Sequence, residues 1–210
     1  MKTPASDQEQ AILSLLDEAY ASRINNLQKS LDLGKKALAL SHDIDNKGLT
    51  GQALTRLSLF YMIMGQYPEA TRNAEEAITL FEELGDDRGV ADAKYSIAGI
   101  YYKTDNYHMG LVHLIDSLAT YKKYQDYHNQ ARVQKSLGTI YEFFGDQKNA
   151  LKSYENSIEA ARKAGDLSLE SNAYNPLSGI YLKQDKPEQA MEIIQKSIGI
   201  KEETGDVRGL

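Results

Sequence analysis

Apolar and polar residues alternate along this chain with the period of amphipathic helices. In one segment Ala93, Ile97 and Tyr101 recur at separations of four residues, which predicts one face of a helix. Asp105 and Asn106 then interrupt the pattern, and a second helical pattern follows them. The segment therefore predicts two antiparallel helices of about four turns each, joined by a short turn.

The same two-helix pattern recurs every 40 residues from residue 51 to residue 210, without insertion or deletion. When the repeats are aligned, one column always has a large aliphatic residue: Leu57, Ile97, Leu137 and Leu177. A second column has tyrosine: Tyr61, Tyr101, Tyr141 and Tyr181. A third has a small residue: Ala70, Gly110, Ala150 and Ala190. A fixed period of about 20 to 50 residues is typical of a solenoid, whose units bury their apolar faces only against their neighbours. The sequence predicts an all-α fold, an α-α superhelix of five helix-turn-helix repeats with ten helices.

We interpret the chain as a single array over residues 1–210. Its repeats are expected at residues 11–50, 51–90, 91–130, 131–170 and 171–210. On the last helix Ile193, Ile194 and Ile198 would have one flank in water, and natural proteins rarely leave such a patch bare. We therefore expect these residues to be part of a longer protein. The alternative is that this end pairs with another chain.

Glycine and aspartate mark the expected helix boundaries. Breaks inside the repeats fall at Gly65–Gln66, Asp105–Asn106, Gly145–Asp146 and Asp185–Lys186, and breaks between repeats fall at Gly85–Asp86, Gln125–Asp126, Gly165–Asp166 and Gly205–Asp206. Glycine readily adopts the left-handed conformation that ends a helix, and an aspartate after it caps the next one. Pro68 and Pro187 stand near the start of second helices, where a missing N–H costs little.

The first repeat departs from the common pattern. Leu16 and Tyr20 match the leucine and tyrosine columns only if the turn after them is one residue longer, and Asp17 replaces the small residue. Ser30 and Ala37 keep the small columns of its second helix. Because terminal repeats carry a wetter outer face, we interpret this repeat as an N-terminal cap.

Composition excludes several kinds of chemistry. The net charge of −6 and the pI of about 5.3 do not favour nucleic acid as a partner. The absence of cysteine excludes disulfides, thiol nucleophiles and thiolate metal sites. The polar stretch Met1–Gln10 lacks the apolar core of a secretory signal, and no segment is long enough to span a membrane. We expect a soluble, cytoplasmic protein.

The spacing Leu137-Gly138-x-x-Tyr141, followed by Ala150, Tyr154 and Ser157, resembles the tetratricopeptide repeat. The usual unit has about 34 residues, and this one is similar to a longer variety whose second helix runs about a turn further. The resemblance covers residues 11–210. It implies a scaffold that binds proteins or peptides in a concave groove. The chain is also similar to the tetratricopeptide arrays at the N-termini of bacterial signalling proteins.

The resemblance also implies which positions line that groove. On the first helix of each repeat one arc varies freely between repeats, while the opposite arc stays apolar. The expected ligand-binding positions are Gln52, Thr55, Leu59, Met62, Asp92, Tyr95, Gly99, Tyr102, Arg132, Lys135, Asn172 and Asn175.

Two features of this arc fit ligand contact. Gly99 and Gly179 lie mid-helix, where the missing side chain lets a ligand backbone approach, although tolerated surface glycine is the favoured alternative. Arg132 and Lys135 lie one turn apart, with Asn172 and Asn175 in the same columns of the next repeat. Guanidinium and amide groups at this spacing suit a carboxylate or a peptide backbone, and a solvated face is the alternative. Relatives that grip a terminal carboxylate use lysine and asparagine where this chain has Lys135 and Thr139, so that specificity is not transferred.

Two local departures lead to further expectations. Pro176 removes a backbone hydrogen bond to Asn172, which predicts a kink in that helix. Repeat 3 holds seven of the fourteen tyrosines and three of the four histidines. Exposed tyrosines favour a partner or self-association surface, whereas Tyr101 is expected in the core. No pair of these histidines has the spacing of a metal site, and no cofactor is predicted.

No catalytic motif stands out, and an open groove does not provide the dry pocket that catalysis needs, so we do not expect an enzyme. The first hypothesis is an adaptor that binds a peptide or protein segment. The alternative is a sensory or regulatory module of a bacterial signalling enzyme, with a nucleotide cyclase, diguanylate cyclase or sensor kinase domain beyond residue 210. Both rest on analogy at the level of the fold.

Overall fold

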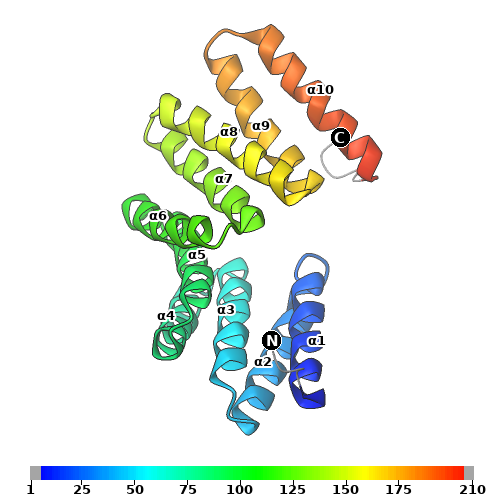
Figure 1. Ribbon diagram of the computed structural model, residues 1–210. Helices are drawn as coiled ribbons and strands as arrows, with labels where there is room; N and C mark the ends of the chain where they lie inside the picture. The colour runs from blue at the N-terminus through cyan, green and yellow to red at the C-terminus, as the bar shows by residue number, and fades with distance from the viewer. Residues whose placement is uncertain (1–5, 206–210) are drawn as a thin grey trace. The chain divides into compact units, whose positions relative to one another are not determined.

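The computed structural model describes residues 6–205, and these residues form ten α-helices joined by short turns (Figure 1). The helices are α1 Asp7–Ser22, α2 Leu27–Asp43, α3 Lys47–Ile63, α4 Tyr67–Leu84, α5 Asp87–Lys103, α6 Tyr107–Lys123, α7 Tyr127–Phe143, α8 Gln147–Ala164, α9 Leu167–Lys183 and α10 Pro187–Thr204. The all-α prediction of paired helices is therefore confirmed. The expected cap at Asp206 and the residues before Ser6 lie outside the described part.

The helix boundaries follow the glycines and aspartates of the sequence. Gly85 and Gly165 take left-handed φ angles of 64° and 67° directly after α4 and α8. The Asp86 and Asp166 carboxylates then accept hydrogen bonds from the backbone of the third residue inside α5 and α9. Each pair ends one helix and caps the next, which fixes the repeat length.

The first repeat has the longer turn that the sequence predicts. Residues 23–26 separate α1 from α2, one residue more than the 64–66 turn between α3 and α4. Ser30 and Ala37 are fully buried, as expected for the small columns of a second helix. A capping box between Ser6 and Glu9 begins α1.

The chain divides into two compact units, unit 1 of residues 1–113 and unit 2 of residues 114–210. In unit 1 successive helices from α1 to α5 pack side by side, and α3 also contacts the first helices α1 and α5 on either side of it. In unit 2 α7 to α10 pack in the same way, with α7 against α9. Within each unit the first helices therefore form one layer, as in a repeat solenoid. A single array over residues 1–210 stays a prediction.

The repeat columns account for much of the core. The aliphatic column is at most 4% exposed at Leu57, Ile97, Leu137 and Leu177. The tyrosine column is only half-buried in all four repeats. Tyr101 is therefore not a fully buried core residue as expected: it is half-buried, and His113 stacks on its ring at 5.5 Å.

A large buried side chain in one column packs against glycine in neighbouring columns. The fully buried ring of Phe81 fills the space that glycine leaves at positions 51 and 89, and a Cβ on Gly51 would stand 2.7 Å from that ring. In the same column of α8 the small Ala161 packs instead against Ala131. The large ring in repeat 2 is thus accommodated by glycine, whereas in repeat 4 two small residues meet in the same columns.

Two expectations concern the C-terminal repeat. α9 stays α-helical through Pro176, and the Ser178 hydroxyl donates to the Asn175 carbonyl at 2.8 Å; a bend of the helix remains a prediction. On α10, Ile193 and Ile194 are half-buried, while Met191 and Ile198 are exposed by 57% and 39%. None of the described helices is long and apolar enough to cross a lipid bilayer.

Candidate functional site

None of the twelve positions that the sequence assigns to a ligand-binding face is buried. Eight of them form the α3–α5 face in unit 1: Gln52, Thr55, Leu59, Met62, Asp92, Tyr95, Gly99 and Tyr102. Four form the α7–α9 face in unit 2: Arg132, Lys135, Asn172 and Asn175. The neighbouring columns are fully buried at Ala53, Ala93, Val133 and Ala173. The arc that varies between repeats is therefore the accessible one.

On the α3–α5 face a side chain already occupies the space above Gly99. A Cβ on Gly99 would stand 3.0 Å from the Met62 sulfur of the neighbouring helix α3. Glycine at this position admits the thioether, so close approach by a ligand backbone is not needed to explain it. Beside it, the rings of Tyr102 and Tyr107 meet edge-to-face at 5.5 Å. This part of the face is largely apolar and aromatic.

The same layer of unit 1 contains a cluster that sequence reasoning missed. The Tyr20 ring on α1 lies 3.6 Å from the guanidinium carbon of Arg23 and 4.4 Å from that of Arg56. Two cations near one ring indicate cation–π contacts from both the turn after α1 and the adjacent helix α3. Arg56 lies more than 30 residues after Tyr20 in the sequence, so no local pattern predicts the contact between them.

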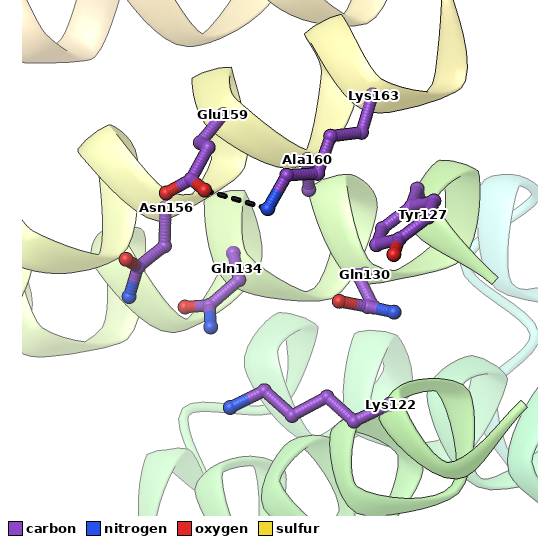
Figure 2. Close-up of a pocket in the computed structure, with 8 residues that line it drawn as sticks. All are labelled: Lys122, Tyr127, Gln130, Gln134, Asn156, Glu159, Ala160 and Lys163. Atoms are coloured by element: carbon purple, nitrogen blue, oxygen red, sulfur yellow. Dashed lines mark hydrogen bonds and ion pairs between the residues drawn. The ribbon is translucent and has the colours of Figure 1, made fainter. Parts of the chain in front are cut away.

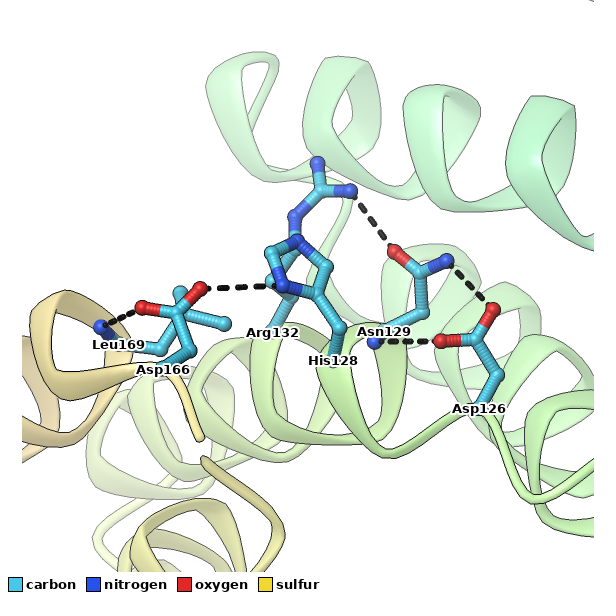
Figure 3. A network of polar contacts seen from close by, with 6 residues as sticks. All are labelled: Asp126, His128, Asn129, Arg132, Asp166 and Leu169. Atoms are coloured by element: carbon cyan, nitrogen blue, oxygen red, sulfur yellow. Dashed lines mark hydrogen bonds and ion pairs between the residues drawn. The ribbon is translucent and has the colours of Figure 1, made fainter. Parts of the chain in front are cut away.

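On the α7–α9 face Arg132 is held by a chain of polar contacts. Its Nη1 donates to Asn129 Oδ1 at 2.9 Å, and Asn129 Nδ2 donates in turn to Asp126 Oδ2 at 3.0 Å. The second Asp126 oxygen accepts the Asn129 backbone N–H at 3.1 Å and so caps α7 (Figure 3). Arg132 is therefore positioned by the cap of its own helix.

Similar polar contacts are found at the start of α9. Asp166 Oδ1 accepts the Leu169 backbone N–H at 2.9 Å, and its Oδ2 lies 3.1 Å from Nδ1 of His128 on α7 (Figure 3). One carboxylate thus caps α9 and links it to the start of α7. This contact ties together the N-terminal ends of the two helices that carry the α7–α9 face.

The other predicted residues of this face differ in how firmly they are held. Lys135 and Asn172 make no side-chain hydrogen bond or ion pair with any of residues 6–205. The Asn175 amide oxygen accepts a long hydrogen bond of 3.4 Å from the Ser197 hydroxyl of α10. Gly179, one turn further along α9, has open space where its Cβ would stand. Lys135 and Asn172 are thus available to a ligand beside an unobstructed stretch of backbone.

The far end of this face is closed by an acidic group. Glu142 accepts a hydrogen bond of 2.7 Å from the hydroxyl of Tyr154 and one of 2.8 Å from the ammonium of Lys183. The Tyr154 hydroxyl also lies 3.3 Å from the Thr139 hydroxyl. Thr139, the residue that replaces the carboxylate-gripping asparagine, is therefore engaged with the protein itself.

A polar triad joins α8 to α9, with Glu170 and Tyr174 buried and Arg162 exposed. The Glu170 carboxylate, 7% exposed, accepts hydrogen bonds from the Arg162 guanidinium at 2.7 Å and from the Tyr174 hydroxyl at 2.6 Å. Arg162 also donates to the Tyr174 oxygen at 2.6 Å. Burial, together with the hydrogen bond to Glu170, raises the pKa of Tyr174 to about 12. Each of the three polar groups therefore has partners, which is how a buried charge is tolerated.

Three models of the tetratricopeptide repeat match this chain, at residues 50–84, 89–163 and 171–204, and together they cover more than half of it. The chain belongs to the tetratricopeptide repeat family. The predicted resemblance is therefore confirmed, and the columns that carry it are those that pack in each unit.

Among curated proteins, the chain is similar to response regulator aspartate phosphatase E of Bacillus subtilis, with 28% identity over 183 residues. That match covers 85% of this chain and 48% of the relative. Regulatory protein RapK of the same bacterium is 22% identical over 150 residues, covering 67% of this chain and 40% of the relative. This tetratricopeptide chain thus spans about half the length or less of these curated relatives.

Among solved structures, a Rap protein complexed with the competence and sporulation factor superposes with a TM-score of 0.83 and 17% identity, covering 96% of this chain and 57% of that one. The apo form of RapI superposes with a TM-score of 0.75 and 17% identity, and the match covers 93% of this chain and 72% of RapI. BtubC from P. vanneervenii superposes with a TM-score of 0.71 and 16% identity, and the match covers 98% of this chain and 95% of BtubC. At these identities the likeness shows a common fold.

A pocket lies on another side of α7. This pocket of about 170 Å³ is lined by residues of α6, α7 and α8: Lys122, Tyr127, Gln130, Gln134, Asn156, Glu159, Ala160 and Lys163 (Figure 2). None of these residues belongs to the twelve predicted positions. The pocket lies between α6 and α8, the second helices of two neighbouring repeats, whereas the α7–α9 face is formed by the first helices of two repeats.

The sequence did contain a signal for this pocket. In the column of Gln134, repeats 2 and 5 have Leu54 and Tyr174, both only 2% exposed, whereas repeat 3 has the half-buried Lys94. Gln134 itself is 7% exposed, so an amide occupies a core position. Two of the four repeats thus have a polar residue in this column, which is the signal that the sequence offers.

Proposed function

We propose that this chain binds an extended peptide or a helical segment of a protein partner on the exposed positions of its first helices, without catalysis of its own. The observation that carries the proposal is the contrast between neighbouring columns: the twelve varied positions are accessible, and the columns beside them are buried. A regular scaffold that varies only on one arc is organised for recognition rather than for packing.

The α7–α9 face indicates what kind of segment would bind there. Lys135 offers an ammonium group and Asn172 a side-chain amide, neither engaged with another of residues 6–205. An amide both donates and accepts hydrogen bonds, as a peptide backbone does, and the ammonium group attracts a carboxylate. Open space over Gly179 admits the backbone of the segment. We therefore expect an extended segment that carries an acidic side chain.

The fold of the relatives supports the same function. A Rap protein of similar fold was solved in complex with the competence and sporulation factor, so a bound factor is compatible with this architecture. At 17% identity the residues that hold the factor are not transferable to this chain. The proposal depends on the side chains described above.

A peptide-display selection against the chain tests the proposal. The dissociation constant of a selected peptide is measured by fluorescence anisotropy for the natural chain and for Arg132→Glu with Lys135→Glu. We expect a loss of at least about tenfold, the equivalent of one charge-assisted hydrogen bond. Lys148→Glu with Lys152→Glu, which reverses two exposed charges on α8, is the matched control. Equal losses in both double variants, or none in either, would contradict the proposal.

A second candidate function is regulatory. The likeness to response regulator aspartate phosphatase E covers only 48% of that relative, which favours an array that works inside a larger signalling protein. In this proposal ligand binding controls an output domain, such as a nucleotide cyclase, diguanylate cyclase or sensor kinase, beyond residue 210. The gene sequence after residue 210 discriminates between the two candidates. A catalytic domain there supports regulation, and a stop codon after a polar capping helix supports the simple adaptor.

We also propose that the chain acts in the cytoplasm, since it contains no cysteine. A fluorescent fusion that localises to the envelope or the medium would exclude this. Self-association is a further expectation, through the exposed Met191 and Ile198 on α10 or through the tyrosine-rich third repeat. Sedimentation velocity of the natural chain and of Ile198→Glu measures it, and a concentration-independent monomer in both would contradict it.

A further inference from the structure

The pocket between α6 and α8 exposes the side-chain amide of a residue that is otherwise buried. Gln134 is 93% buried, since only 7% of it is exposed, and its side chain makes no hydrogen bond with any of residues 6–205. Figure 2 shows the Gln134 side chain directed into the pocket, toward α6. Gln134 is not among the described residues with a side-chain atom both buried and unpaired, so its amide reaches the open pocket, where a ligand can pair with it.

Two more polar groups of the lining are available in the same way. The Asn156 amide on α8 and the Lys122 ammonium on α6 make no side-chain contact of this kind with the rest of the described chain. Two amides present both donors and acceptors, and the ammonium presents donors with a positive charge. Together these three side chains can pair with a ligand that has an anionic oxygen and a nearby N–H.

The charges at the rim favour an anion. Lys163 lies 2.7 Å from Glu159, so these two groups neutralise each other, and the ammonium of Lys163 also lies 5.6 Å from the Tyr127 ring centre. Lys122 is then the lining residue whose charge no other lining residue neutralises. The pocket thus carries one net positive charge in a chain whose overall charge is −6.

We propose that this pocket binds a carboxylate that carries a neighbouring amide or amine N–H, either an acidic residue of a peptide or a free acidic amino acid. Lys122 pairs with the carboxylate, and Gln134 and Asn156 exchange hydrogen bonds with the amide. The volume of about 170 Å³ is below the roughly 300–1,000 Å³ of pockets for drug-sized ligands, so one residue is the appropriate size. The site is separate from the α7–α9 face, and the proposal does not depend on what binds there.

Calorimetric titration of the 210-residue chain tests this site with three probes of known structure. N-acetyl-L-glutamate amide represents an acidic peptide residue, N-acetyl-L-glutamine amide is its neutral counterpart, and L-glutamate is the free amino acid. We expect the blocked glutamate or the free glutamate to bind at least about tenfold more tightly than the blocked glutamine. Preference for the blocked form assigns the site to peptides, and preference for the free form assigns it to an amino acid. Binding of none of the three at millimolar concentration would overturn the proposal.

Variants then locate the bound probe. Gln134→Leu and Lys122→Gln should each weaken binding at least about tenfold, since each removes one group that pairs with the probe. Lys152→Gln, on an exposed part of α8 outside the pocket, should leave binding unchanged. Because Gln134 has no partner within the described chain, Gln134→Leu should not lower the melting temperature. Unchanged binding in both pocket variants, or a melting temperature lowered by Gln134→Leu, would overturn the assignment.

Discussion

Gly138 on α7 lies directly against the ring of Tyr154 on α8. A Cβ on Gly138 would stand 2.5 Å from Tyr154 Cε1, closer than real side chains approach one another. The ring is fully buried, and its hydroxyl is tied to Glu142, so it has little freedom to move away. The two helices of this repeat can therefore approach so closely only because the position is glycine.

Gly138→Ala should destabilise the chain by about 1–3 kcal/mol, the usual range for an extra methyl group in a packed core. The strain between Cβ and the Tyr154 ring is the reason. Urea denaturation followed by circular dichroism measures the change. A free energy of unfolding equal to that of the natural chain would show that α7 and α8 separate without cost.

Gly179→Ala is the matched substitution on a surface. No atom lies within 4 Å of the Cβ position, and the residue lies inside α9. Alanine is favoured over glycine in a helix interior by about 0.8–1 kcal/mol, so this variant should be more stable than the natural chain. The same denaturation experiment checks it. A loss of stability here would indicate a contact over Gly179 that the structure does not show.

Leu137→Ala should cost about 2–5 kcal/mol, the range for buried leucines elsewhere. Leu137 is 4% exposed and belongs to the repeat column that packs each first helix into the core. A repeat contacts only its neighbours, so no other layer compensates for the cavity. Thermal unfolding of the variant measures the loss, and a change below about 1 kcal/mol would be inconsistent with this packing.

The Arg162–Glu170–Tyr174 triad predicts a pH dependence. Burial raises the pKa of Tyr174 from its ordinary value near 10 to about 12 in the folded chain. Between these pH values the folded chain keeps a proton that the unfolded chain has lost, so stability falls as pH rises, by at most about 1.4 kcal/mol per pH unit. Below pH 10 this contribution is fully present.

Tyr174→Phe removes that proton and should flatten the stability curve across this alkaline range. Tyr107, whose pKa is also raised to about 12 by its hydrogen bond to Asp105, contributes equally to both chains and cancels in the comparison. Urea midpoints measured across the range for the two chains provide the test. Parallel curves would mean that Tyr174 ionises in the folded chain as it does in the unfolded chain.

Most of the fold could be predicted from the 40-residue register. Gly85 with Asp86, and Gly165 with Asp166, end and cap helices where the sequence places them, because both effects depend on residues adjacent in the chain. The extra turn residue before α2 followed from the same alignment. Which arc of each first helix is accessible was also predictable, since packing keeps one arc apolar in every repeat.

Contacts between side chains on different helices were not predictable in this way. Met62 fills the space over Gly99, although a single glycine in sequence looks the same whether its space is filled or open. The Arg162–Glu170–Tyr174 triad depends on the exact approach of α8 and α9. The tyrosine column has the same period as the apolar columns, so the sequence alone did not show that its residues are only half-buried.

The central claim is that a peptide partner lies on the first helices of each unit. Because the chain has no cysteine, single cysteines can report contact at Thr55, Tyr95, Lys135 and Asn175, with Glu76 on α4 and Lys152 on α8 as controls. The rate of thiol alkylation is measured for each variant with and without the selected peptide. We predict that the peptide slows alkylation on at least one of the two faces and leaves both controls unchanged. Protection of position 76 or 152, with none at the four positions on the faces, would contradict the account.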